Sequence, residues 1–236
     1  MHAITKQIPN AVTCCNLVCG CAAAYFAFGG QPATAFALII AGAAADFFDG
    51  MAARLLHVSS PIGKELDSLA DVVTFGVAPS AMLFHYLSTA AYPVFMSEAS
   101  AWLPFSAFAV AAFSAYRLAK FNLDTRQATT FLGLPTPANA LFWASLIVGV
   151  GDRLSQTPTA LPAVLVLCAA SCWLLVSETP MMAFKFKHWG WRGNEVKYAF
   201  AAFCIPMLFT FRLAAFAAIV AAYAIVSAIT AKKAED

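Results

Sequence analysis

Residues 33–54 read ATAFALIIAGAAADFFDGMAAR, an apolar stretch that ends in two aspartates and an arginine. A helix needs about 20 apolar residues to cross a hydrocarbon core of ~30 Å, so this stretch predicts a membrane-spanning helix. The composition agrees, because 61% of the 236 residues are hydrophobic and only 11% are charged. Soluble domains are about one quarter charged, and disordered chains are poor in aromatic residues, which make up 14% of this one. We therefore predict an all-α polytopic membrane protein.

Further apolar stretches, bounded by Gly, Pro and charged residues, flank this one. With 33–54, the predicted spans are 11–28, 65–90, 101–121, 136–151, 160–177, 196–209 and 211–230. The stretch 65–90 begins with polar residues, so part of it should lie at the membrane interface. Only Thr210 and Arg212 divide the last two stretches, and Pro206 could instead kink one longer helix. The prediction is about eight transmembrane helices in a single domain covering residues 1–236.

The positive charges give an independent test of this topology. With the N-terminus inside the cell, all but two of the 14 Lys and Arg residues fall on the inner side, the exceptions being Arg153 and Arg212. Cytoplasmic loops of membrane proteins carry this excess. Both termini are therefore predicted to be cytoplasmic, which requires 196–209 and 211–230 to be separate spans. The net charge of +2 is small and scattered, so no nucleic-acid partner is expected.

Four acidic residues crowd the inner ends of the second and third spans. Asp46 and Asp49 are three residues apart and Asp67 and Asp71 are four apart, so each pair shares one helix face. One uncompensated charge inside a span costs at least ~2.5–3.5 kcal/mol on insertion scales. Two divalent cations would neutralise the four carboxylates, and oxygen ligands suit Mg2+ or Mn2+ better than zinc. The alternative, a surface cluster without an ion, has no basic residues interleaved at pairing distance except Arg54 and Lys64.

Small residues and an arginine accompany these aspartates. Gly50 and Ala53 allow a ligand or a neighbouring helix to approach closely, and Arg54 could hold a phosphate with its fork of donors. Two metal ions and a guanidinium are typical of phosphoryl or phosphatidyl transfer, in which catalysis is mainly positioning and charge neutralisation.

Residues 46–71 follow the pattern Asp-x2-Asp-Gly-x2-Ala-Arg-x8-Gly-x3-Asp-x3-Asp, which resembles the signature of the CDP-alcohol phosphotransferases at every fixed position. The resemblance implies an enzyme that cleaves a CDP-linked lipid, releases CMP and joins the phospho-lipid to an alcohol. It implies that Asp46, Asp49, Asp67 and Asp71 hold two divalent cations, Mg2+ or Mn2+, and that Asp71 is also the base. The residues expected to bind the CDP and phosphate groups are Gly50, Ala53, Arg54, Gly63, Asn10 and Thr13, with helix capping as the alternative for the last two.

Other segments resemble the phosphatidylserine synthase branch of this family. They are residues 8–16, 65–79, 116–122 and 133–138. These segments map to the inner ends of the first five spans, so they could converge on one polar cavity. Arg117, Asn122 and Asn16 are the candidate serine-binding residues. The alternatives are a snorkelling membrane anchor for Arg117 and an interhelical hydrogen bond for Asn16.

This resemblance implies transfer of the phosphatidyl group from CDP-diacylglycerol to L-serine at the cytoplasmic face of the inner membrane. The expected partners are these substrates, membrane lipid and a second copy of the chain in a homodimer. Another acceptor, such as glycerol 3-phosphate or inositol phosphate, remains open, although its phosphate would favour a denser basic cluster. Two other classes are weaker alternatives. An intramembrane prenyltransferase spaces its aspartate motifs farther apart, and a cation transporter would place its carboxylates near the bilayer midplane.

Overall fold

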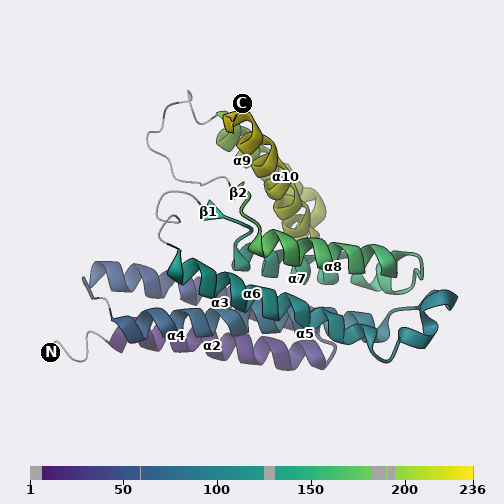
Figure 1. Ribbon diagram of the computed structural model, residues 1–236. Helices are drawn as coiled ribbons and strands as arrows, with labels where there is room; N and C mark the ends of the chain where they lie inside the picture. Colours follow the sequence, from purple (N-terminus) through teal and green to yellow (C-terminus); the bar gives the residue numbers. More distant parts are fainter. Residues whose placement is uncertain (1–6, 59, 125–130, 182–189, 191–194, 236) are drawn as a thin grey trace.

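The structure, a computed structural model, describes residues 7–58, 60–124, 131–181, 190 and 195–235, and helices dominate it (Figure 1). The α-helices are α2 (Gln7–Phe28), α3 (Pro32–Leu55), α4 (Pro61–Asp71), α5 (Ala78–Thr89), α6 (Phe108–Leu123), α7 (Thr136–Ser155), α8 (Ala160–Val176), α9 (Glu195–Phe211) and α10 (Ala215–Glu235). The shorter elements are the π-helix η1 (Val72–Val77), the 3-10 helices η2 (Val94–Ala99), η3 (Leu103–Ala107) and η5 (Arg212–Ala214), and the strands β1 (Phe131–Leu132) and β2 (Pro180–Met181).

All the predicted apolar stretches are helical, and the all-α prediction is confirmed. The stretch 65–90 lies in one continuous helical run formed by α4, η1 and α5. The stretch 101–121 begins differently from the prediction, because 3-10 turns precede α6, which starts only at Phe108. Pro104 lies in the first turn of η3, where its missing N–H is tolerated.

The starts of α3 and α4 follow from local sequence. Pro32 opens α3, and Pro61 opens α4 immediately after Ser60. The Ser60 hydroxyl accepts a hydrogen bond of 2.9 Å from the backbone N–H of Gly63 and so caps the helix. The aspartate-bearing end of α3 is thereby followed closely by the aspartate-bearing α4, and both helices pack against α2.

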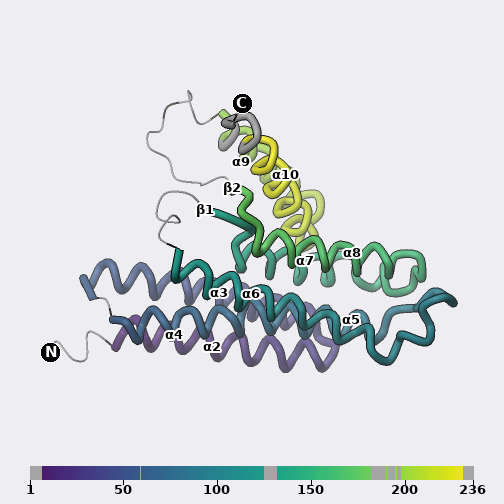
Figure 2. Tube along the Cα trace, viewed as in Figure 1, coloured from purple at the N-terminus to yellow at the C-terminus, as the bar shows by residue number. Residues whose placement is uncertain are grey.

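The last two predicted stretches are two helices that pack against each other. Arg212 has a positive φ of 48°, a conformation that interrupts the helix between α9 and α10. The chain reverses there, and the end of α10 returns to the beginning of α9 (Figures 1 and 2). Pro206 lies within α9 and does not mark the division.

The helices are those of a multi-pass membrane protein. Within the described residues, the helical runs long and apolar enough to cross a membrane are Gln7–Phe28, Pro32–Leu55, Pro61–Thr89 and Tyr198–Thr230, and the last of these contains the reversal at Arg212. Ala160–Val176 is apolar but shorter. The total of eight spans and the cytoplasmic position of both termini stay predictions. Some of the cations counted for the topology lie outside the described residues, namely Lys6, Arg126, Lys185, Lys187 and Arg192.

Close packing around η1 fixes the helices that carry the aspartates. Gly20 of α2 and Gly42 of α3 both face Thr74, and a Cβ on either glycine would collide with that threonine. The Thr74 hydroxyl donates a hydrogen bond of 3.0 Å to the backbone carbonyl of Asn16. Three helices therefore meet at van der Waals distance just beyond Asp71, as small residues allow in membrane helices.

Candidate active site

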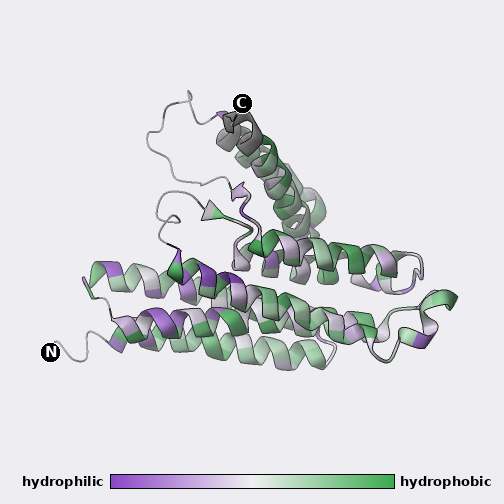
Figure 3. Ribbon diagram, in the orientation of Figure 1, coloured by the Kyte–Doolittle hydropathy of each residue, from purple (hydrophilic) through white to green (hydrophobic). Residues whose placement is uncertain are grey.

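Polar residues gather at one end of the helix bundle. The start of α2, the end of α3, the start of α4 and the end of α6 all lie at this end (Figure 1), and hydrophilic residues are frequent there (Figure 3). The convergence expected from the sequence is thus present for these four helices.

Three of the four signature aspartates form one group of potential ligands. Carboxylate oxygens of Asp46, Asp49 and Asp67 lie within 4.8 Å of one another. Asp46 and Asp49 come from α3 and Asp67 comes from α4, so the group joins two helices. Asp71 lies outside this set but interacts electrostatically with all three of its members.

The donor set fits a hard divalent cation. All ligand atoms of the group are carboxylate oxygens, which Mg2+ and Mn2+ prefer. The Oδ1 atom of Asp67 is buried and accepts no hydrogen bond, so a strong acceptor there has no partner within the protein. Buried carboxylates brought this close require a counter-charge, and a cation between them supplies it.

Two residues of α2 hold the aspartates in place. The Thr13 hydroxyl donates a hydrogen bond of 2.6 Å to Oδ2 of Asp49. The Asn16 amide donates one of 3.1 Å to Oδ1 of Asp71. Thr13 and Asn16 are both buried, and they lie one turn apart on the same helix face. The interhelical hydrogen bond considered for Asn16 is therefore present.

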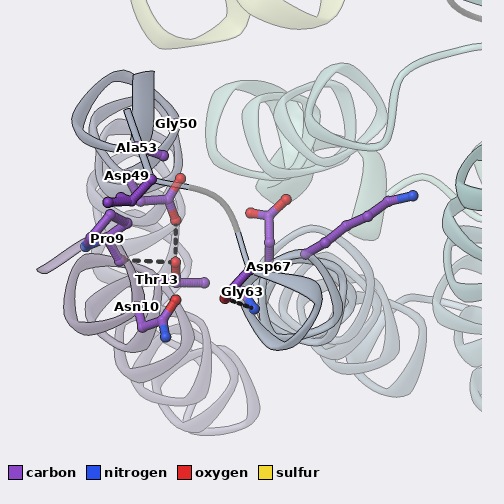
Figure 4. Close-up of a pocket in the computed structure, with 11 residues that line it drawn as sticks. Pro9, Asn10, Thr13, Asp49, Gly50, Ala53, Gly63 and Asp67 are labelled. Atoms are coloured by element: carbon purple, nitrogen blue, oxygen red, sulfur yellow. Dashed lines mark hydrogen bonds between the residues drawn. The ribbon is translucent and has the colours of Figure 1, made fainter. Parts of the chain in front are cut away.

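A cavity of about 220 Å3 opens beside this group. Figure 4 shows Asp49, Thr13 and Asn10 on one side of the cavity and Gly63 and Asp67 on the other. The lining residues are Pro9, Asn10, Thr13, Asp49, Gly50, Ala53, Val58, Ser60, Gly63, Lys64 and Asp67. Most of the residues expected to bind CDP and phosphate are thus brought to one place.

Arg54 and Lys64 differ from the sequence expectation. Arg54, expected to hold phosphate, is exposed in the last turn of α3 and does not line the cavity. Lys64, to which no role was given, does line it. The sequence could have indicated Lys64 as a cavity residue, because it directly follows the signature glycine Gly63 in the first turn of α4.

The candidate serine-binding residues occupy different surroundings. Arg117 is only 7% exposed, and its Nε donates a hydrogen bond of 2.9 Å to the backbone carbonyl of Leu134. It also interacts electrostatically with Asp71. Asn122 instead donates a hydrogen bond of 2.8 Å to the Ser68 hydroxyl and so joins the end of α6 to α4. Asn16 thus contacts Asp71 and Arg117 lies within electrostatic range of it, whereas Asn122 pairs with the neighbouring helix.

Comparisons with known proteins agree with this geometry. The model of the family described as CDP-alcohol phosphatidyltransferase matches residues 6–175. The chain is 39% identical to a CDP-diacylglycerol–serine O-phosphatidyltransferase of Bacillus subtilis, over 56% of this chain and 70% of that protein. Proteins of the same description from Mycobacterium leprae and Helicobacter pylori J99 are 40% and 35% identical, over 59% and 56% of this chain.

The matched region covers 46% of the mycobacterial relative and 54% of the Helicobacter relative, so the chain spans about half the length of these two proteins. The family match itself extends over well more than half of this chain and includes the whole 46–71 signature, the cavity and Arg117. It ends within α8, before the α9–α10 hairpin. The chain therefore belongs to the CDP-alcohol phosphatidyltransferase family.

Proposed function

We propose that the protein transfers the phosphatidyl group of CDP-diacylglycerol to the hydroxyl of L-serine, giving phosphatidylserine and CMP. The observation that carries the proposal is the group Asp46, Asp49 and Asp67 at the edge of a cavity lined by signature residues. The choice of serine is supported by the relatives in three bacteria, each described as a serine O-phosphatidyltransferase. The family match favours this reaction over an intramembrane prenyltransferase or a cation transporter.

The cavity suits the nucleotide end of the lipid donor. A Cβ on Gly50 would meet nothing within 4 Å, so the surface beside Asp49 is open to a ligand. Lys64 adds a positive charge beside the cavity; its ammonium donates a hydrogen bond of 3.3 Å to the backbone carbonyl of Asn122 and would turn toward a bound phosphate. Asn10 and Ser60 add polar atoms near Gly63, where the nucleotide can be hydrogen-bonded. The pyrophosphate is thereby directed toward the three carboxylates.

Catalysis requires a base, an acceptor and a stabilised leaving group. Two divalent cations, Mg2+ or Mn2+, would be held by the four aspartates and would neutralise the charge on the pyrophosphate. Asp71, oriented by Asn16, takes the proton from the serine hydroxyl. The serine oxygen then forms a bond to the phosphorus that carries diacylglycerol, the bond from that phosphorus to the bridging oxygen breaks, and CMP leaves. Arg117, a buried cation that interacts electrostatically with Asp71, holds the serine carboxylate.

Residues 1–236 would act as one catalytic domain in the inner membrane. The site would face the cytoplasm, since CDP-linked lipid and soluble serine can both reach the inner leaflet. The positive charges that we counted on that side support this orientation. A homodimer is the expected assembly.

The test of the proposal is CMP release from CDP-diacylglycerol by the purified full chain in detergent. L-serine, glycerol 3-phosphate and inositol phosphate are supplied in parallel, each with Mg2+, with Mn2+ or with a chelator. We expect release that requires both serine and the metal ion. Release with only another acceptor would refute serine as the substrate while keeping the aspartate mechanism. No release with any acceptor from folded protein would refute the transferase.

The base is tested by Asp71→Asn. The amide keeps the size of the side chain but cannot take a proton, so turnover should fall by about 10²–10⁴-fold, the usual contribution of a general base. The conservative replacement should leave the thermal unfolding temperature unchanged or higher, which separates lost chemistry from lost folding. Turnover close to that of the unaltered protein would rule out Asp71 as the base.

A further inference from the structure

Asn139 is an unexplained polar residue in the interior. It lies in the first turns of α7 and is completely buried, yet neither its side-chain oxygen nor its side-chain nitrogen has a hydrogen-bond partner. Buried amides in folded proteins are nearly always paired, and an unpaired one usually marks a place for water or a ligand. The backbone N–H of Asn139 is satisfied by the carbonyl of Pro135, so only the side chain lacks partners.

The start of α7, which carries Asn139, meets a buried positive charge. The carbonyl that accepts from Arg117 belongs to Leu134, the residue before Pro135, which is the N-cap of α7. The guanidinium is therefore at the N-terminal end of α7. No side chain caps this helix, and because Pro135 and Pro137 have no N–H, the groups without an intrahelical partner are the N–H groups of Thr136 and Ala138. A cationic side chain and the positive end of a helix dipole meet here, which favours a carboxylate.

Arg117 and the start of α7 lie near both the proposed base, Asp71, and the α9–α10 hairpin. Arg117 interacts electrostatically with Asp71 of α4 and with Tyr223 of α10. Gly149 of α7 packs against Ala214, and the Ser145 hydroxyl accepts a hydrogen bond from the backbone N–H of Ala217. These two contacts show that α10 runs antiparallel to α7, which carries Tyr223 toward the first turns of α7.

From this arrangement we propose that Asn139 is a specificity-determining residue that binds the polar head of an amino-acid acceptor beside Arg117. The acceptor's carboxylate lies between the guanidinium and the start of α7. The Asn139 amide donates to that carboxylate and its carbonyl oxygen accepts from the ammonium group. The acceptor's hydroxyl is then directed toward Asp71. This inference rests on the proposed transfer to serine, and it adds a residue that the signature does not contain.

The decisive variant is Asn139→Leu, which keeps the approximate volume and removes both polar atoms. The KM for L-serine should rise by about tenfold or more, as expected when two hydrogen bonds to charged groups are lost, while the KM for CDP-diacylglycerol stays within about twofold. The ligand-free protein should unfold at a higher temperature, because an unpaired buried amide has been replaced by an apolar group.

Ser145→Ala is the matched control, since Ser145 is a buried polar residue of the same helix that already has a partner. Loss of the Ser145 hydroxyl should lower the unfolding temperature and leave the KM for L-serine unchanged. An Asn139→Leu variant with an unchanged KM for serine, with equal rises in both KM values, or with a lowered unfolding temperature would overturn the proposal.

The two proposals fail in different ways. If the unaltered protein released CMP with glycerol 3-phosphate but not with serine, the proposed function would be wrong. The KM of Asn139→Leu for glycerol 3-phosphate would then decide the position of Asn139. A rise in the KM for glycerol 3-phosphate alone would show that Asn139 contacts the acceptor. An unchanged KM would show that Asn139 lies outside the acceptor site.

Discussion

The two ends of the chain are held in the protein by different means. At the start, α2 contacts α3 and α4 through polar side chains, with hydrogen bonds from Thr13 to Asp49 and from Asn16 to Asp71. At the end, the α9–α10 hairpin adjoins α7 through apolar packing, such as Val220 in the core cluster with Trp143, and through small residues, such as Ala214 against Gly149. Polar contacts between helices fix the directions of side chains, whereas contacts between small residues fix only the separation of two backbones.

This difference indicates where the function resides. Directed side chains are needed to hold metal ions and to position reacting groups within fractions of an ångström. The α2–α4 region meets that need, and the hairpin instead supplies a wall for the interior near Arg117. Substitutions of the polar residues in the first region should therefore affect activity more than stability, and substitutions at close backbone contacts or in the hairpin should do the reverse.

The largest effect is expected from Asp67→Asn. The change removes one charge from the three-carboxylate group and should lower CMP release by about 10³-fold, a loss typical of removing one preorganised electrostatic group. The midpoint of thermal unfolding without metal should not fall, because repulsion within the group decreases. Glu65→Gln is the control on the same helix, since Glu65 is exposed, and its activity should change less than twofold. Equal losses in the two variants would contradict a special role for Asp67.

A smaller loss is expected from Thr13→Val. Valine has nearly the same shape but cannot donate to Asp49, so the carboxylate loses its orienting partner. Residues that orient metal ligands typically contribute about 10–100-fold to metal affinity, and the Mn2+ concentration for half-maximal activity should rise accordingly. Thr13→Ser keeps the hydroxyl and should restore most of the affinity. If the Thr13→Ser and Thr13→Val variants had the same Mn2+ dependence, the hydrogen bond to Asp49 would be irrelevant to metal binding.

Gly42→Ala should act on stability. A Cβ at Gly42 would lie 2.6 Å from Cγ2 of Thr74 and 2.9 Å from Oδ1 of Asn16, so α3 must move away from η1. Overpacking of this kind typically lowers the free energy of unfolding by about 1–3 kcal/mol. Gly50→Ala provides the comparison on the same helix, because its Cβ would meet nothing within 4 Å. Reversible unfolding in detergent should show a loss for Gly42→Ala only.

The smallest effect is expected at the turn of the hairpin. Arg212 adopts a positive φ of 48°, which is unfavourable for a residue with a Cβ. Arg212→Gly should raise the free energy of unfolding by up to about 1 kcal/mol and leave CMP release unchanged. Arg212→Ala removes the same charge but keeps the Cβ, so it should give no gain. A gain in both variants would assign the effect to the charge instead of the backbone.

The sequence predicted the helices and the signature region well, for a physical reason. Hydropathy is a property of each stretch alone, and the spacing of Asp46 and Asp49 or of Asp67 and Asp71 fixes their shared face on a helix. Contacts between helices distant in sequence were less accessible. The exposed position of Arg54, the pairing of Asn122 with Ser68 and the burial of Asn139 depend on how the helices pack.

The π-helical segment Val72–Val77 bears on how the protein adjusts to a change of bilayer thickness. It divides the run from Pro61 to Thr89 into two segments, α4, which carries Asp67 and Asp71, and the more apolar α5. Membrane helices answer a change of bilayer thickness by tilting or kinking. A widened turn is a place where the helix can change direction, and the contacts of Gly20 and Gly42 with Thr74 hold this turn against α2 and α3. A tilt of α5 at this turn would therefore leave the aspartates of α4 facing those of α3.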